Sequence, residues 1–226
     1  MSRIKAIAID IDGTLTDDKR RLDLKAVAKL REIEALGIPV ILATGNILCL
    51  TEYSSVLLGT SGCLIAENGG VIKDVYKNKV IYLADIKKVE EAFEYLRKKL
   101  PVRKVSKSEL RKTEIAIYRD FSTEKIREIL KDFEDIEVVD TKFAIHIKNK
   151  NVNKGIALKK IAEIMGISMD EIAAIGDSEN DKEMLAMAGF SISVAEESLK
   201  KYCDYVAKSG EEALNIVIKK ILNNRK

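Results

Sequence analysis

Residues 4–16 read IKAIAIDIDGTLT. The run from 4 to 9 is mainly apolar, which predicts a short buried strand that ends at Asp10. Residues two apart in a strand share a face, so Asp10 and Asp12 can project to one side at the strand's carboxyl end. Gly13 permits a sharp turn in which the backbone approaches a ligand. Two neighbouring carboxylates repel each other, so the pattern indicates a bound cation, most simply Mg²⁺.

The Asp-x-Asp pair has a simpler alternative explanation, since such a pair is also typical of a polar strand end followed by a turn. Here the pair follows an apolar strand and leads into Gly-Thr-Leu-Thr, a combination that favours a functional site.

Strand and helix patterns alternate after this stretch. Apolar residues at helical spacing predict a helix over residues 24–36, ended by Gly37. Strands are predicted at 38–43 and 63–66, with a helix at 47–58 between them. The order strand, helix, strand, helix, strand is typical of a parallel sheet with right-handed crossovers.

The same alternation returns near the C-terminus. We predict, in order, a helix at 154–165, a strand at 172–175, a helix at 181–188, strands at 191–194 and 205–207, and a helix at 211–222. The middle of the chain is richer in strands and charge, with helices predicted at 86–100 and 123–133 and strands at 114–118, 137–139 and 143–147. The chain is therefore predicted to be α/β, with a doubly wound parallel-sheet (Rossmann-like) core over residues 1–82 and 153–226 and an inserted α+β module over 83–152.

A second acidic cluster, GDSEND at residues 176–181, directly follows a predicted strand. Asp and Ser near a helix N-terminus can cap free N–H groups, but capping needs only one or two such residues. A calcium-binding loop fits poorly, because its turn glycine is absent and a strand precedes the cluster. Metal binding by Asp177 and Asp181, together with the first acidic pair, is the better interpretation.

Three further segments have a functional and a simpler interpretation. Thr44-Gly45-Asn46 offers a hydroxyl and backbone N–H groups for phosphate oxygens, or forms an ordinary strand-to-helix turn. Lys154 at a helix N-terminus has the unfavourable sign for the helix dipole, which indicates a bound anion or a solvated lysine. Residues 67–70, ENGG, mark the point where the inserted module leaves the core, or are simply a loop.

Composition argues against several classes of function. The 226 residues have a net charge of +3 with interleaved signs, which disfavours a nucleic-acid partner. No apolar run approaches the about 18 residues of a membrane span, and no signal peptide is present, so we expect no membrane partner and a cytoplasmic location. Three cysteines without metal-ligand spacing indicate buried thiols in a reducing compartment.

The motifs, in this order, resemble those of the haloacid dehalogenase-like superfamily of phosphotransferases over the whole chain. The matches are Asp10-x-Asp12-Gly13-Thr14, Thr44, Lys154 and Gly176-Asp177-x-x-x-Asp181 for motifs I to IV. The module at 83–152 looks like the cap domain of the Cof-type branch. Many enzymes of that branch have Thr-Gly-Arg where this chain has Thr-Gly-Asn, and with ENGG and the short cap the chain looks most like the phosphoglycolate phosphatases of archaea.

This resemblance implies a mechanism. Asp10 would be the nucleophile that forms an aspartyl-phosphate, and Asp12 would protonate the leaving oxygen and then activate water. Mg²⁺ would be held by Asp10, the backbone carbonyl of Asp12 and Asp177, with help from Asp181. The implied substrate-binding residues are Thr44, Gly45, Asn46 and Lys154.

The resemblance also implies a Mg²⁺-dependent phosphomonoester hydrolase that acts on a small phosphorylated metabolite, first of all 2-phosphoglycolate, as a monomer or homodimer. Another small sugar or organic phosphate is the alternative substrate. A phospho-aspartate receiver domain is a second alternative, but its acidic pair would be adjacent in sequence and it would carry no inserted module. A non-catalytic binding protein on the same fold is a third, against which the intact catalytic positions argue.

A substrate carboxylate would need a cation of its own, because the core cations are committed to the phosphoryl group. The expected source is the basic residues of the cap, which are Arg103, Lys104, Lys107, Arg111, Lys112, Arg119, His146 and Lys148.

Overall fold

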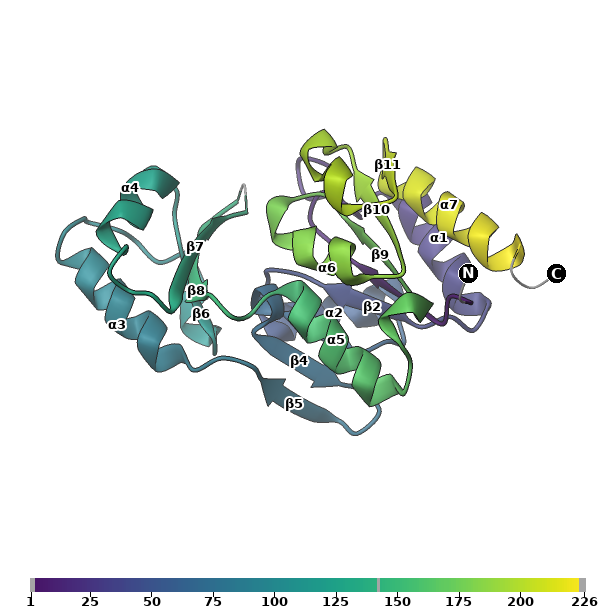
Figure 1. Cartoon of the computed structure of the whole chain (residues 1–226), viewed down its shortest axis with the longest axis horizontal. Helices are drawn as coiled ribbons and strands as arrows, with labels where there is room; N and C mark the ends of the chain where they lie inside the picture. The colour runs from purple at the N-terminus through teal and green to yellow at the C-terminus, as the bar shows by residue number, and fades with distance from the viewer. Residues whose placement is uncertain (1–2, 142, 224–226) are drawn as a thin grey trace.

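The computed structural model describes residues 3–141 and 143–223. They form a larger body around an eight-stranded sheet and a smaller body around a three-stranded sheet (Figure 1). The chain leaves the larger sheet after Tyr82, builds the smaller body, and re-enters the larger body at Lys154. The smaller body is thus inserted into the middle of the larger one.

Six parallel strands make up most of the larger sheet, in the order β11-β10-β9-β1-β2-β3. They are β1 (Ala6–Ile9), β2 (Val40–Ala43), β3 (Leu64–Ala66), β9 (Ile172–Gly176), β10 (Phe190–Val194) and β11 (Tyr205–Ala207). An antiparallel hairpin, β4 (Val71–Asp74) and β5 (Lys79–Tyr82), extends the sheet beyond β3. This sheet confirms the predicted α/β class with a Rossmann-like core.

Helices cover both faces of the larger sheet (Figure 1). The helices are α1 (Leu24–Ala35) and α7 (Gly210–Asn223) on one face, α5 (Lys154–Met165) and α6 (Lys182–Met187) on the other, and α2 (Leu48–Leu58) beside β3 and α1. Strand β1 explains this arrangement, because Ile7 and Ile9 belong to the core under α1 and α7, whereas Ala6 and Ala8 belong to the core under α5 and α6. A strand that is apolar on both faces needs cover on both.

The smaller body packs two helices against an antiparallel sheet of order β6-β8-β7. Its elements are α3 (Ile86–Arg97), β6 (Glu114–Ile117), α4 (Thr123–Ile129), β7 (Ile136–Asp140) and β8 (Ile145–Asn149). One short 3₁₀ segment, η2 (Ser108–Leu110), also belongs to the smaller body. The 3₁₀ segments of the larger body are η1 (Glu67–Gly69), η3 (Met169–Glu171), η4 (Glu179–Asp181) and η5 (Glu197–Tyr202). The body has an apolar core of its own, which includes Val89, Phe93, Ile126 and Ile147.

Three sequence-predicted elements of the smaller body are wrong in extent. Helix α3 ends at Arg97 instead of residue 100, and the backbone N–H groups of Lys99 and Leu100 both donate to the carbonyl of Leu96 in a closing turn. Helix α4 ends at Ile129 instead of residue 133, because a turn from Leu130 brings the ring of Phe133 to 5.4 Å from that of Tyr95 and leads back into β7. Strand β8 begins at Ile145 instead of residue 143, because the backbone N–H of Thr141 donates to the carbonyl of Ala144 and closes a turn.

One expectation about the thiols is wrong. Cys63 is buried, but Cys49 on α2 is exposed. Among the helices described, none combines the length and the apolar character that crossing a membrane requires.

Helix α1 offers a matched test of the core. Leu30 is fully buried against the sheet, whereas Leu24 on the same helix is 76% exposed. We expect Leu30→Ala to lower the free energy of unfolding by about 2–5 kcal/mol, because it removes buried apolar surface and leaves a cavity. Leu24→Ala should change it by less than about 0.5 kcal/mol. Urea unfolding followed by circular dichroism measures both, and equal losses would contradict the packing described.

Candidate active site

The predicted site residues of the larger body meet at the carboxyl ends of β1, β2 and β9. Asp10 directly follows β1, Thr44 follows β2 and Asp177 follows β9, and these strands are neighbours in the order β9-β1-β2. Lys154 begins helix α5 and reaches the same place. In open parallel sheets, ligands bind at this edge.

Lys154 lies at the centre of the site. Its side chain is fully buried, and its Nζ donates to Oδ1 of Asp10 and to Oδ1 of Asp181, both at 2.6 Å. Burial by itself would lower the pKa of this lysine, but the two carboxylates outweigh burial and raise it. Lys154 is therefore a fixed cation that holds Asp10 and Asp181 together.

Negative charge exceeds positive charge around Asp10. Burial raises the pKa of this carboxyl well above its usual range; the charge of Lys154 opposes the rise, and the carboxylates of Asp181 and Asp177 add to it. One ammonium thus faces three acidic groups. A second cation at this point would stabilise the ionised form of Asp10.

The acidic cluster has the chemistry of a divalent-metal site. Asp10, Asp177 and Asp181 each offer a carboxylate oxygen, and these oxygens all lie within 4.8 Å of one another. Oδ2 of Asp10 is buried and has no hydrogen-bond partner among the described residues. Carboxylate oxygens are the ligands that Mg²⁺ prefers, so this donor set fits the ion.

Asp181 differs from the other two acids because both of its oxygens are already engaged. Oδ1 accepts the hydrogen bond from Lys154, and Oδ2 accepts from the backbone N–H groups of Asp177 and Ser178, both at 3.1 Å. Asp181 thereby fixes the lysine and the loop that carries Asp177.

Gly13 lets the loop after β9 approach the turn after β1. Its φ is +93°, and a Cβ at this position would lie 2.2 Å from Oδ2 of Asp177. Any side chain here would push the Asp177 carboxylate away from the turn. The glycine therefore brings the second acidic cluster against the first.

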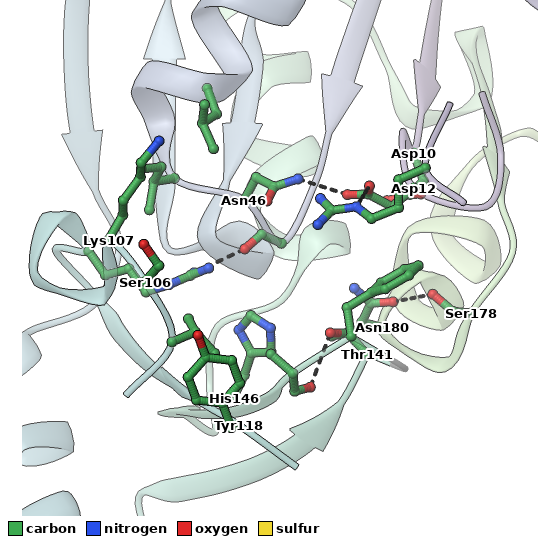
Figure 2. A pocket seen from close by; sticks show the side chains of 18 residues that line it. Asp10, Asp12, Asn46, Ser106, Lys107, Tyr118, Thr141, His146, Ser178 and Asn180 are labelled. Carbon is green, nitrogen blue, oxygen red and sulfur yellow. Dashed lines mark hydrogen bonds and ion pairs between the residues drawn. The ribbon is translucent and has the colours of Figure 1, made fainter. Parts of the chain in front are cut away.

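The carboxylate of Asp12 points elsewhere and does not join the three-acid cluster. Oδ1 accepts from Nε of Arg20 at 2.7 Å, and Oδ2 accepts from Nδ2 of Asn46, also at 2.7 Å (Figure 2). Asn46 thus holds Asp12 by its side chain. Oγ1 of Thr44 accepts from the backbone N–H of Asn46 at 3.1 Å, which leaves the hydroxyl proton of this buried threonine free for another acceptor.

A cavity of about 340 Å³ lies between the two bodies. Figure 2 shows Asp10, Asp12 and Asn46 from the larger body on one side, and Lys107, Tyr118 and His146 from the smaller body on the other. The volume is at the small end of the range for ligand pockets, which suits a small molecule. Four of the predicted site residues are buried and are not among the described residues that line this cavity. They are Thr44, Lys154, Asp177 and Asp181.

Glu67 joins the two bodies. Its buried carboxylate accepts hydrogen bonds from the backbone N–H groups of Lys112 and Thr113, at 3.0 and 2.8 Å, and from Oγ1 of Thr113 at 2.7 Å. Burial raises the pKa of Glu67 against the effect of these hydrogen bonds. Glu67 and Asn68 both have φ near +50°, a conformation that non-glycine residues rarely adopt and that is concentrated at functional sites. Residues 67–70 are therefore more than a simple loop, but the expectation that they mark the point where the inserted module leaves the core is wrong, because β4 and β5 continue the larger sheet as far as Tyr82.

Asn68 extends this connection. Its Oδ1 accepts from Nδ2 of Asn180 at 2.9 Å, and its Nδ2 donates to Oε2 of Glu114 in the smaller body at 2.8 Å. Oε1 of Glu114 lies 2.8 Å from Nδ1 of His146 and also pairs with Arg111. Burial alone would raise the pKa of Glu114, but His146 and Arg111 outweigh it and lower the pKa to about 2.

Several of these residues were not singled out from the sequence. Arg20 lies in a run of exposed charged residues that looks like any solvated segment, and Glu114 is one of many acids in the inserted module. Positive φ at Glu67 has no sequence signal, because glutamate rarely adopts this conformation, whereas Asn68 is of a residue type that adopts it more often. Side-chain contacts such as Arg20 with Asp12 and Asn68 with Glu114 depend on how the chain folds, which local patterns do not reveal.

The chain matches a known protein family over most of its length. The family model for haloacid dehalogenase-like hydrolases matches residues 7–106 and 98–218. The phosphoglycolate phosphatase of Methanothermobacter thermautotrophicus is 50% identical over 208 residues, which cover 91% of this chain and 93% of that protein. The phosphoglycolate phosphatase of Archaeoglobus fulgidus is 46% identical over 211 residues and 92% of each chain.

Solved structures agree with this assignment. Protein 0175 of Thermoplasma acidophilum has a TM-score of 0.88 at 25% identity, with 98% of this chain and 99% of that chain covered. A phosphatase of the haloalkanoate (HAD) superfamily from Bacteroides thetaiotaomicron has a TM-score of 0.80 at 17% identity, with 96% and 95% covered. The second likeness concerns the fold alone.

The pKa of Glu114 generates a prediction about stability. Because this pKa is about 2 in the folded protein against a usual 4.5, ionised Glu114 stabilises the fold above pH 4.5, by an amount on the order of 3 kcal/mol. That contribution is lost as the pH falls from 4.5 toward 2. We expect Glu114→Gln to be much less stable than wild type at about pH 7 and closer to it at about pH 3 in urea unfolding.

Glu128→Gln is the control, because Glu128 is an exposed acid of the same body. Its difference from wild type should stay small at both pH values. A Glu114→Gln difference that does not change with pH would contradict the assignment.

Proposed function

The chain belongs to the haloacid dehalogenase-like hydrolase family, and we propose that it is a Mg²⁺-dependent phosphatase that hydrolyses 2-phosphoglycolate to glycolate and phosphate through a phosphorylated aspartate. The observation that carries the proposal is the buried pairing of Lys154 with Asp10 and Asp181, beside an Asp10 oxygen that has no hydrogen-bond partner. Relatives named phosphoglycolate phosphatase, 42–50% identical to this chain, support the choice of substrate.

Asp10 is the proposed nucleophile. One of its carboxylate oxygens forms a bond to phosphorus while the bond from phosphorus to the ester oxygen breaks. Asp12 gives a proton to the departing ester oxygen, then takes a proton from the water that attacks the phosphorus of the aspartyl-phosphate. This second displacement releases phosphate and restores Asp10. Arg20 and Asn46 orient the carboxylate of Asp12 at the cavity, and they favour its ionised form, which is the base; to carry the proton as the acid, Asp12 has to give up one of these two contacts.

The remaining residues act on charge and position. Lys154 and the hydroxyl of Thr44 are proposed to bind the phosphoryl oxygens, with Gly45 and Asn46 beside them. Mg²⁺ would be held by Asp10, Asp177 and the backbone carbonyl of Asp12, and when bound it supplies the positive charge that an anionic nucleophile needs to approach a phosphate dianion. Because both of its oxygens are engaged, Asp181 supports this site mainly by fixing its neighbours.

We assign residues 1–82 and 153–226 to the catalytic core and residues 83–152 to a cap. A cavity lined by both parts supports this division, since the cap can enclose a small substrate and exclude water from the aspartyl-phosphate. The alternative substrate is another small phosphate ester. A panel of phosphate monoesters, assayed with and without Mg²⁺, tests the proposal, and an absence of metal-dependent hydrolysis across the panel would reject it.

The roles of the two acids of motif I can be separated by kinetics. We expect Asp12→Asn to lower kcat by about 10²–10⁴-fold, the usual contribution of a general acid and base. Asp10→Asn should lower it further, to an undetectable rate, because an amide is not a useful nucleophile. Thermal unfolding of both variants serves as the control for folding. Near-normal turnover by Asp10→Asn would rule out the nucleophile assignment.

The roles of Asp177 and Asp181 differ in a measurable way. Asp177→Asn should raise the Mg²⁺ concentration needed for half-maximal activity more than Asp181→Asn does. The reason is that both carboxylate oxygens of Asp181 already accept hydrogen bonds from protein donors. Asp181→Asn should instead lower thermal stability more, because it deprives the fully buried Lys154 of a partner. Metal titrations and melting curves measure the two effects, and identical behaviour of the variants would contradict this distinction.

A further inference from the structure

The basic residues of the cap are not equivalent in the structure. Arg103 pairs with Asp120, Arg119 pairs with Asp140, and Lys148 pairs with Glu137. The Nζ of Lys104 lies over the ring of Phe93, and Lys112 is exposed at the surface. Of the lysines and arginines in this group, only Lys107 and Arg111 line the cavity between the two bodies.

Arg111 is a buried cation with one edge unused. Its side chain is 8% exposed, and Nη1 donates to the carbonyl of Gly45 at 2.9 Å and pairs with Glu114. Nε is buried and has no hydrogen-bond partner, and Nη2 makes no hydrogen bond to the described residues. Nε and Nη2 form the edge of a guanidinium that binds a carboxylate through two parallel hydrogen bonds.

A buried donor without an acceptor is unfavourable, and a bound anion would satisfy it. Alternatively, the unused edge could be a by-product of the pairing with Glu114. Arg111 lines the cavity between the two bodies, so an anion bound in that cavity would lie beside its guanidinium, and this favours a ligand.

Lys107 is the second cation of the cavity wall. Its ammonium makes no ion pair with the described residues. Its φ is +65°, an unfavourable conformation for a residue with a side chain, and strained positions of this kind are concentrated at ligand sites. In Figure 2, Lys107 and the neighbouring Ser106 lie across the cavity from Asp10 and Asp12.

Arg111 also lies close to the proposed phosphoryl-binding residues. Arg111 holds the carbonyl of Gly45, the residue that follows Thr44 in the proposed phosphoryl site. The guanidinium of Arg111 therefore lies next to the residues proposed to bind the phosphoryl group. The other cavity arginine, Arg20, is already paired with Asp12.

Building on the proposed phosphatase function, we propose that Arg111 and Lys107 bind a second anionic group of the substrate, a carboxylate one carbon away from the phosphate ester oxygen. The substrate class is then the phosphorylated small hydroxy acids. Phosphorylated sugars carry neutral hydroxyls at this position, and hydroxyls would leave the Nε–Nη2 edge of Arg111 and the ammonium of Lys107 without an anionic partner.

The experiment compares two substrates that differ only in that group. These are 2-phosphoglycolate and ethyl phosphate, in which a methyl group replaces the carboxylate. The measured quantity is the ratio of their kcat/KM values in wild type, Arg111→Lys and Lys107→Gln. Arg111→Lys keeps the charge but removes the two-bond edge, and Lys107→Gln removes the charge of an exposed residue.

Matched controls come from the same segment but lie outside the cavity. They are Arg103→Lys and Lys104→Gln. We expect wild type to favour 2-phosphoglycolate by roughly tenfold or more, and each cavity variant to reduce that ratio several-fold, mainly through KM for 2-phosphoglycolate. The controls should keep the wild-type ratio.

The outcomes separate this inference from the proposed function. Hydrolysis of neither substrate by wild type would overturn the proposed function and, with it, the inference. Equal kcat/KM values for the two substrates in wild type would leave the phosphatase in place but overturn the carboxylate site. A wild-type preference that persists unchanged in Arg111→Lys and Lys107→Gln would overturn the assignment to these residues.

Discussion

The buried ammonium of Lys154 is the contact on which the geometry of the site depends. It draws together the end of β1, the start of α5 and the loop after β9, three segments that are distant in sequence. A charge with no access to water must be paired, so Asp10 and Asp181 cannot move away without a large loss of stability. Asp181 passes this constraint to the loop of Asp177 through two backbone hydrogen bonds. The acids are therefore placed before any ligand arrives.

Polar contacts rather than an apolar core tie the smaller body to this site. Glu67 holds the backbone of the segment before β6, Asn68 connects the loop after β9 with Glu114, and Arg111 holds the carbonyl of Gly45. Interfaces of this character can separate and re-form at modest cost, which is what a cap over a hydrolytic site requires. The strained φ values of Glu67 and Asn68 mark this connection.

Charge is distributed around the cavity in two zones. On the side of the core, three carboxylates face one lysine, so the zone lacks positive charge and suits a metal ion. On the side of the cap, Arg111 and Lys107 carry more positive charge than Glu114 balances. A substrate with a phosphate at one end and a carboxylate at the other fits this layout, because under the proposed mechanism Mg²⁺ and Lys154 would meet the phosphate while the cap would meet the carboxylate.

Three features could be predicted from the sequence alone. They are the alternation of strands and helices, the apolar strand β1, and the acids that follow β1 and β9. They determine the α/β fold, and they bring Asp10, Thr44, Lys154 and Asp177 to one edge, because parallel strands present their carboxyl ends on the same side. The sequence did not distinguish Lys107 and Arg111 from the other basic residues of the cap, nor did it indicate that Arg20 holds Asp12. Only the tertiary structure decided these points, because whether a charged side chain is paired or lines a cavity depends on how the folded backbone directs it, and local periodicity carries no information about that direction.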